Sequence, residues 1–307
     1  DWSSDVCSSD LGYQQSMAFA HALAGVKPMR VVREMPGSLP ITDEKAGMIR
    51  VPVRIGDHTL GAMVDTGANM SAITTSVAER LGIQMLDQSA SISSATERTV
   101  ATRLGIAKRL QIGNVALENV VFIVLPDSKL SLPPSYRISA IIGLPVLMAL
   151  GRLEIVNSGT PRLLYGISRV KTANDTEARP NILLSGLEPL VLVHVPGADN
   201  PLRMTLDTGS DRTYFTRNAM RDAPSLFAHA EHYVWHVGSA GKVATERRDL
   251  RLPETPFTIG GRRIVLKNVI VSSHDSSTRD GVIGEDMLLQ GASWTIDFKT
   301  MTFSAAN

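Results

Sequence analysis

The sequence predicts an all-β protein built from two tandem copies of one domain. The first observation is an Asp-Thr-Gly tripeptide that occurs twice, at Asp65 and at Asp207, each time after a short and mostly apolar run. The second is spacing, since Asp65 precedes Gly143 of an Ile-Ile-Gly triplet by 78 residues and Asp207 precedes Gly284 of a Val-Ile-Gly triplet by 77. The third is composition, because both copies consist of short β-branched runs between turn residues. A repeat of about 120 residues has the size of a small domain, so we expect two similar lobes.

Composition excludes several classes of protein. The 307 residues are 43% hydrophobic, which is enough for two cores, and 31 basic against 30 acidic residues leave a net charge of +1. The basic residues do not gather in a stripe, so no nucleic-acid partner is predicted. The longest weakly charged run, 138–151, is about 14 residues and a membrane helix needs about 20, so no membrane span is predicted in this chain. Cys7 is the single cysteine, which rules out an intrachain disulfide and leaves the compartment open.

The first 45 residues are expected to lie outside the lobes. Residues 1–11 resemble a translated sequencing adapter, which implies that the natural N-terminus is missing. The Ala-rich stretch 12–30 is interpreted as a helix or linker. Ala22-Leu23-Ala24 would also fit a signal-peptidase site, but the preceding residues are too polar for a good signal peptide. Residues 31–45 contain proline, glycine and an acidic pair and are predicted to be a linker. Localisation therefore stays unknown, with export to the periplasm possible.

The first lobe is predicted to span 46–168. Residues 49–55 alternate as a strand, and a turn at Gly56 leads into the strand that delivers Asp65. A short helix follows Thr74. The remaining predicted elements are a polar, β-leaning stretch at 91–100, a buried strand at 120–125, a loop at 127–136, a helix at 144–150 and closing strands at 153–156 and 163–165.

The second lobe is predicted to span 182–304, after a polar linker at 169–181. It repeats the plan of the first. Its strand 202–206 leads into Asp207, Thr216 stands where Thr74 does, a glycine-tipped hairpin covers 235–243, and a closing hairpin covers 293–303.

These motifs resemble those of aspartic proteases of the retropepsin and pepsin group, and two copies in one chain resemble bacterial retropepsin-like proteins. The resemblance covers about 46–304 and is specific at the Asp-Thr-Gly and apolar-apolar-Gly segments. It implies a catalytic pair, Asp65 and Asp207. It also implies hydrogen bonds that cross-link the two loops through their threonines, and glycine amides near the carboxylates. A hydrogen bond from Ser210 to Asp207 is possible. The residues implied for the loops are Thr66, Gly67, Ala68, Thr208, Gly209 and Ser210, and those for the strands behind them are Ile142, Gly143, Ile283 and Gly284.

A pair of carboxylates can hydrolyse a peptide without a cofactor. Two carboxyl groups about 3 Å apart cannot both ionise and so share one proton, which gives one base to activate water and one acid to protonate the substrate. No metal is predicted, because His232 and His236 are four apart in a strand-like context rather than on a helix. Glu285 and Asp286 are interpreted as a solvated helix start rather than as catalytic acids.

Two functions remain open at this point. The first is an aspartic endopeptidase acting on extended peptides with apolar side chains near the cut. The alternative is a catalytically silent module that binds a peptide as an added strand on the same fold. The pepsin branch carries a tyrosine in its first flap, whereas Ala95 and Thr96 stand at 91–100 here, so substrate clamping is undecided. A monomer with one site between its lobes is expected, and a dimer that pairs each Asp with its own copy is the other arrangement.

Overall fold

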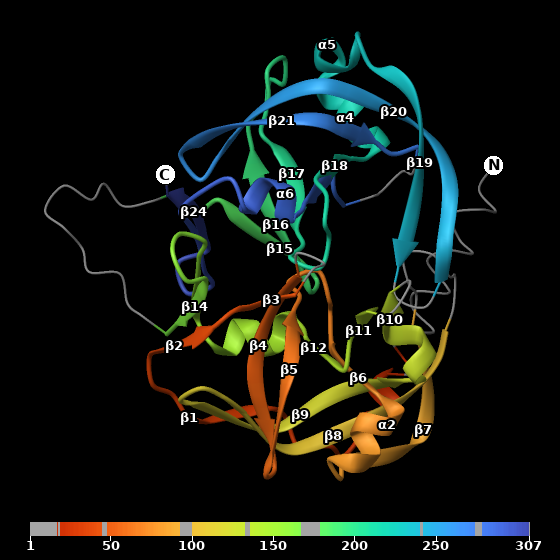
Figure 1. Ribbon diagram of the computed structural model, residues 1–307, viewed down its shortest axis with the longest axis vertical. Coiled ribbons are helices and arrows are strands. Elements are labelled where there is room, and N and C mark those ends of the chain that lie inside the picture. The colour runs from red at the N-terminus through yellow and green to blue at the C-terminus, as the bar shows by residue number, and fades with distance from the viewer. Residues whose placement is uncertain are drawn as a thin grey trace, which may run out of the picture.

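The computed structural model describes residues 17, 19–44, 48–92, 100–132, 136–166, 179–239, 242–273 and 278–306. It is an all-β molecule of two barrel lobes with short helices at their surfaces, which confirms the predicted fold class (Figure 1). None of the helices in the described ranges is long and apolar enough to cross a membrane.

The first lobe is a closed six-stranded barrel. Its strands pair in the ring order β4-β5-β12-β6-β9-β8, and β8 returns to β4. Outside the ring, β7 extends the sheet from β8, β1 pairs with β9, and β3 pairs with β4. The strands are β1 (Arg30–Arg33), β3 (Thr42–Glu44), β4 (Met48–Ile55), β5 (His58–Val64), β6 (Ser71–Thr74), β7 (Gln84–Ile92), β8 (Val100–Ile112), β9 (Val115–Leu125) and β12 (Ala140–Ile142).

The second lobe repeats this ring with different strand lengths. The order is β16-β17-β22-β18-β21-β20, and an isolated antiparallel bridge between His194 and Thr258 brings β20 back to the end of β16. The outer strands are β15 and β19. The strands are β15 (Ile182–Ser185), β16 (Glu188–Val193), β17 (Leu202–Leu206), β18 (Tyr214–Phe215), β19 (Glu231–Ser239), β20 (Lys242–Ile259), β21 (Arg262–Val271) and β22 (Gly281–Ile283).

Short helices occupy corresponding places in the two lobes. Thr74 and Thr216 take the extended N-cap conformation before α2 and α4, although neither side chain makes a capping hydrogen bond. The helices α3 and α6 follow Gly143 and Gly284, so each begins directly behind an Asp-Thr-Gly loop. The remaining elements are the helices α2 (Thr75–Arg80), α3 (Leu144–Ala149), α4 (Arg217–Asp222), α5 (Pro224–Phe227), α6 (Glu285–Leu288) and η1 (Asp127–Leu130), and the hairpin of β10 (Ser131–Leu132) and β11 (Tyr136–Arg137).

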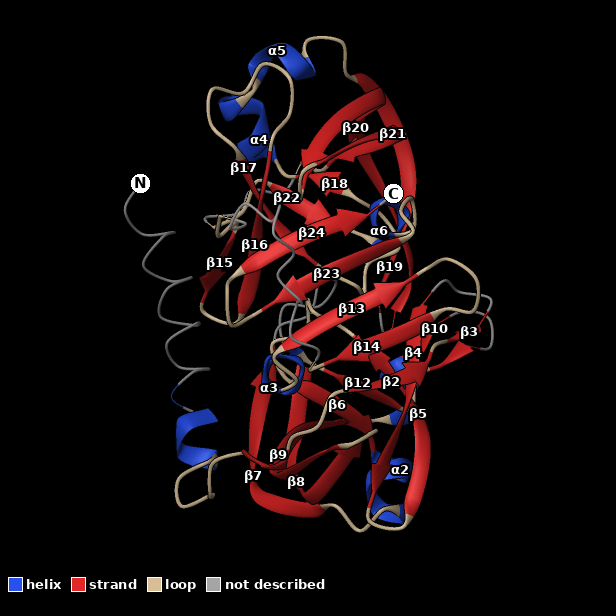
Figure 2. Cartoon of the chain, turned by 90° about the vertical axis from the view of Figure 1, so that its left-hand side faces the viewer, coloured by secondary structure: helices blue, strands red, loops and turns tan. Residues whose placement is uncertain are grey.

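A five-stranded sheet joins the lobes. Its order is β2 (Gly37–Pro40), β14 (Arg162–Tyr165), β13 (Arg152–Val156), β23 (Ser293–Asp297) and β24 (Thr302–Ala306). The strands β13 and β23 lie side by side between the barrels (Figure 2) and pair at five positions, from Arg152–Asp297 to Val156–Ser293. The two lobes therefore share one continuous layer of hydrogen-bonded backbone.

The prediction that residues 31–45 are a linker was wrong. This stretch forms β1, β2 and β3, which join the barrel and the central sheet. Leu39 is 8% exposed and belongs to the main core. Isolated strands of three or four residues lack a periodic signal of their own, because their stability comes from partners distant in the sequence. The predicted linker 169–181 falls mostly outside the described residues, and the lobe boundaries remain predictions.

Candidate active site

Each Asp-Thr-Gly loop begins where a buried central strand ends. Asp65 follows β5 and its backbone N–H donates to the carbonyl of Ile142 at 3.1 Å, whereas Asp207 follows β17 and donates to the carbonyl of Ile283 at 3.0 Å. In both lobes the neighbouring strand, β12 or β22, runs parallel to the strand that carries the aspartate. The apolar-apolar-Gly segments thus lie behind the loops in both copies.

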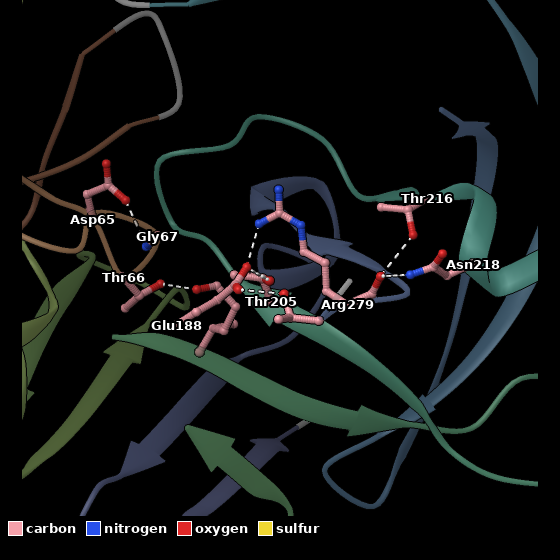
Figure 3. A network of polar contacts seen from close by, with 10 residues as sticks. Asp65, Thr66, Gly67, Glu188, Thr205, Thr216, Asn218 and Arg279 are labelled. Carbon is pink, nitrogen blue, oxygen red and sulfur yellow. Dashed lines mark hydrogen bonds and ion pairs between the residues drawn. The ribbon is translucent and has the colours of Figure 1, made fainter. Parts of the chain in front are cut away.

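Two threonines join the loops to each other. The Thr66 hydroxyl donates to the carbonyl of Leu206 at 2.6 Å, and the Thr208 hydroxyl donates to the carbonyl of Val64 at 2.8 Å. Each threonine N–H also donates to the other hydroxyl at 3.1 Å. Neither side chain is exposed to solvent. Four buried hydrogen bonds therefore fix the distance between the loops, with Thr66 and Asp65 visible on one side in Figure 3.

The two glycines show how closely the aspartates approach. A Cβ on Gly67 would lie 2.5 Å from Oδ1 of Asp207, and a Cβ on Gly209 would lie 2.6 Å from Oδ2 of Asp65. Each loop backbone thus touches the carboxyl group of the opposite lobe. Only glycine leaves room for this reciprocal contact, so the structure brings Asp65 and Asp207 to one place.

Backbone amides and burial set the charge of the pair. Oδ1 of Asp65 accepts from the N–H groups of Gly67 at 2.9 Å and Ala68 at 3.0 Å, and Oδ1 of Asp207 accepts from Gly209 at 2.9 Å. Burial, reinforced by the negative charge of Asp207, raises the pKa of Asp65 to about 7. Burial also raises the pKa of Asp207, against the opposing effects of the Gly209 amide and the Arg279 charge. Asp65 is therefore the better holder of a shared proton.

A second layer of hydrogen bonds holds the loops from behind. The N–H of Gly143 donates to the Ser71 hydroxyl at 3.1 Å, and the N–H of Gly284 donates to the Thr213 hydroxyl at 3.0 Å. A Cβ on Gly143 would lie 2.6 Å from the Met70 carbonyl carbon, so this position also needs glycine. Sequence reasoning missed Ser71 and Thr213. The sequence feature that identifies them is a hydroxyl-bearing residue six positions after each aspartate.

Two expectations about the second loop were wrong. The Ser210 hydroxyl donates to the carbonyl of Arg212 at 2.9 Å, and Ser210 bonds to Asp207 through its backbone N–H instead, which donates to the Asp207 carbonyl at 3.2 Å. The start of α6 is not solvated, since Glu285 is 4% exposed and Asp286 accepts from the Thr213 N–H at 2.8 Å and hydroxyl at 2.6 Å. Burial raises the pKa of Asp286 despite these hydrogen bonds. The cause is the position of α6 against the Asp207 loop, where the Glu285 N–H donates to the carbonyl of Ser210 at 2.9 Å.

A charged cluster distinguishes the second lobe from the first. Glu188 forms an ion pair with Arg279 at 2.5 Å and accepts from the Thr205 hydroxyl at 2.6 Å (Figure 3). Thr205 lies two residues before Asp207 on β17, where the first lobe has Met63 before Asp65. Arg279 lies 91 positions after Glu188, a separation at which no local sequence pattern could connect them.

The strands of both flap hairpins are described, but their tips, residues 93–99 and 240–241, are not. Residues 93–99, including Ala95 and Thr96, lie outside the described residues, as does the side chain of His236. In the second hairpin the Trp235 indole donates to Asp249 at 2.7 Å, and Asp249 also accepts from the Ser273 N–H at 2.8 Å. These bonds lower the pKa of Asp249 although burial acts in the opposite direction. Trp235 thereby ties β19 to β20.

Comparison with known proteins agrees with this geometry. Residues 51–146 match the family model described as aspartyl protease. A search of curated proteins found no match. The matched segment contains most of β4, the other barrel strands of the first lobe, Asp65 and its loop, and the start of α3. Over residues 51–146 the chain is therefore similar to retropepsin-like aspartyl proteases.

Proposed function

We propose that the chain is an aspartic endopeptidase whose single active site combines Asp65 with Asp207. The observation that carries the proposal is the reciprocal contact in which Gly67 touches one carboxyl group and Gly209 touches the other. Two partly buried carboxyl groups of different lobes, held by a hydrogen-bonded frame, have the composition that acid–base hydrolysis of an amide requires.

In the proposed mechanism a water molecule lies between the two carboxyl groups. Asp207 takes a proton from this water while the oxygen attacks the peptide carbonyl carbon, and Asp65 gives its proton to the carbonyl oxygen. The resulting tetrahedral diol collapses when Asp207 gives the proton that it took to the amide nitrogen and Asp65 takes a proton back from one diol hydroxyl, so that the C–N bond breaks, an acid and an amine leave, and both carboxyl groups return to their starting states. We give the shared proton to Asp65 because the negative charge of Asp207 raises the pKa of Asp65, whereas the charge of Arg279 favours the ionised form of Asp207.

Hydrolysis of a peptide library tests the proposal. We expect the wild-type chain to cleave at acid pH and to be inhibited by a pepstatin-type compound, whereas Asp65→Asn and Asp207→Asn each lose activity by at least about 10³-fold. Asp211→Asn is the matched control, since its side chain is 78% exposed and it stands four residues from Asp207. Peptide binding without hydrolysis by the wild type would instead support the silent binding module.

A further inference from the structure

Four positions near Asp207 carry polar side chains where the first lobe carries apolar ones. Strand register aligns the two barrels, and the spacing to Gly143 and Gly284 aligns the segments before these glycines. The aligned pairs are Glu188 with Met48, Thr205 with Met63, Tyr214 with Ala72, and Arg279 with Ile138. We call the four residues of the second lobe the polar quartet. Their first-lobe counterparts all belong to one apolar cluster or pack against it, so the fold itself does not require polar groups here.

The polar quartet lies on the face of the sheet that carries Asp207. Side chains alternate along a strand, so Thr205 shares a face with Asp207, whereas Leu206 between them packs into the main core. On β18 the neighbour of Tyr214 is Phe215, which also packs into the main core. Tyr214 and Thr205 therefore point to the same side of the barrel wall, away from the core.

Glu188 and Arg279 join this face through direct contacts. Glu188 accepts from the Thr205 hydroxyl at 2.6 Å and forms its ion pair with Arg279 (Figure 3). The Thr278 hydroxyl also donates to Glu188, at 3.3 Å. The carboxylate thus has three donors, and the two opposite charges neutralise each other. The side chains of Glu188 and Arg279 are 20% and 34% exposed, so solvent reaches the pair.

The backbone around Arg279 is fixed by several hydrogen bonds. The Arg279 carbonyl accepts from the Thr216 hydroxyl at 3.0 Å and from the Asn218 side-chain amide at 3.1 Å (Figure 3). The N–H of the next residue, Asp280, donates to the Arg203 carbonyl at 2.7 Å, and its carboxylate accepts from the Arg203 N–H at 2.7 Å. Arg279 is therefore held in place before any ligand arrives, which lowers the entropic cost of binding one.

The hydroxyl of Tyr214 lies among these charges. The residue is half-buried, and burial raises the pKa of its phenol, with the charges of Arg279, Asp207, Arg247 and Glu188 close enough to act on it. Among the residues that the structure describes, this hydroxyl has no hydrogen-bond partner. A tyrosine hydroxyl can donate one hydrogen bond and accept another, so it can serve a ligand on this face.

The balance of charge indicates which ligand fits. A lysine or glutamate side chain of a peptide would bring an unpaired charge to a half-buried place where Glu188 and Arg279 already neutralise each other. A leucine would cover the Tyr214 hydroxyl and leave it without a partner. A primary amide carries no charge, and it both donates and accepts. Glutamine and asparagine side chains therefore match this face better than charged or apolar ones.

We propose that the polar quartet is a subsite for an amide side chain, glutamine or asparagine, of a peptide bound beside Asp207. Tyr214 determines the specificity, because its hydroxyl donates to the oxygen of the amide. The inference rests on the proposed function in taking the ligand to be a peptide. It gives the two lobes different preferences, since the counterparts of the quartet in the first lobe are apolar.

Paired peptides test the role of Tyr214. Two octapeptides differ only in carrying glutamine or methionine, which has a similar length but no amide, at one of the two positions that flank the cut; each position is varied in turn. At one of them, kcat/KM of the wild type should be at least about tenfold higher for glutamine. Tyr214→Phe should remove about tenfold from the glutamine peptide and less than about twofold from the methionine peptide. Tyr233→Phe, which removes a hydroxyl from the outer strand β19, is the control and should change neither. Equal losses for both peptides would overturn the specificity role.

The wild type alone keeps the test valid if Tyr214→Phe does not fold. A glutamate peptide is uncharged below the side-chain pKa of about 4.3, so it should resemble the glutamine peptide at about pH 3.5 and be cleaved at least about tenfold less well at about pH 6. A preference for methionine or lysine over glutamine at both positions would overturn the subsite.

Peptide binding separates this inference from the proposed function. Fluorescein-labelled forms of the glutamine and methionine peptides are titrated into Asp65→Asn, with and without Tyr214→Phe. A Kd about tenfold lower for glutamine, lost in Tyr214→Phe, supports the subsite, and equal Kd values overturn it. If this difference is found while the wild type hydrolyses neither peptide, the subsite stands and the endopeptidase assignment fails. If the wild type hydrolyses both peptides equally well, the assignment stands and the subsite fails.

Discussion

Positions 67 and 209 must be glycine because a side chain at either one would collide with the carboxyl group of the opposite lobe. We expect Gly67→Ala to abolish peptide hydrolysis and to lower the Tm, because the new methyl group would occupy the space of the Asp207 carboxyl group. Gly61→Ala is the matched control on β5, since its nearest neighbour would be Cδ of Arg50 at 3.9 Å, an ordinary contact. Activity assays and thermal unfolding of both variants decide the matter. A fully active Gly67→Ala would show that the carboxyl groups lie farther apart than described.

Asp65 should make stability depend on pH in a specific direction. Its pKa rises from 3.8 to about 7 on folding, so the folded state holds a proton that the unfolded state releases. Stability from this group is therefore present below about pH 4 and is lost as the pH rises to about 7. We expect Asp65→Asn to have a higher Tm than wild type at pH 7.5 and a similar Tm at pH 4. Asp211→Asn should follow the wild type, and a Tm difference that is independent of pH would contradict the expectation.

Arg279 should determine how far the pH can fall before activity is lost, which is the acid limb of the pH–activity profile. Its charge lowers the pKa of Asp207, so Arg279→Met should raise that pKa and move the acid limb to higher pH. The bell-shaped profile then narrows from its acid side, while the alkaline limb, set by Asp65, moves less. Arg279→Lys should restore much of the wild-type profile, and Arg263→Met, at an exposed position of β21, is the control. An acid limb unchanged in Arg279→Met would refute this role.

At the scale of elements, sequence periodicity identified the long strands and missed the short ones. Residues 49–55 alternate and lie in β4, and the strand that leads into Asp65 is β5. The sequence predicts a linker where β1 and β2 lie, because four residues are too few to show the two-residue alternation of a strand. The partners of these strands are also far away in the sequence. The aspartates could be found from the repeat, since the motif is local. The Glu188–Arg279 pair could not, because long-range pairing decides which charges meet.

The buried position of β2 leads to a stability prediction. Leu39→Ala should lower the free energy of unfolding by about 2–4 kcal/mol, because the leucine is 8% exposed within the main core. Leu187→Ala is the control, since that leucine is 42% exposed and its loss should change stability by about 0.5 kcal/mol or less. Urea unfolding of both variants provides the measurement. A Leu39→Ala cost as small as that of the control would restore the linker interpretation of this segment.

At the scale of the whole molecule, the site should be built within one chain. The four hydrogen bonds of Thr66 and Thr208 connect segments 142 residues apart in the same polypeptide. We therefore expect purified Asp65→Asn and Asp207→Asn to be inactive alone and to remain inactive when they are mixed. If each aspartate paired with its copy in a second molecule, either variant would keep one intact pair and about half of the activity. Substantial activity in one purified variant would contradict the one-chain site.

The sheet shared by the lobes also bears on how the protein is made. The inner strand β13 has a local partner in β14, but its other partner, β23, begins 137 residues after β13 ends. At roughly 5–20 residues per second a ribosome needs about 7–27 s to synthesise that interval. Throughout it the nascent first lobe exposes five residues of open strand edge, which invites pairing with a neighbouring nascent chain. When the second lobe is complete, β23 pairs with β13 and covers this edge, so the second lobe protects the first from aggregation during translation.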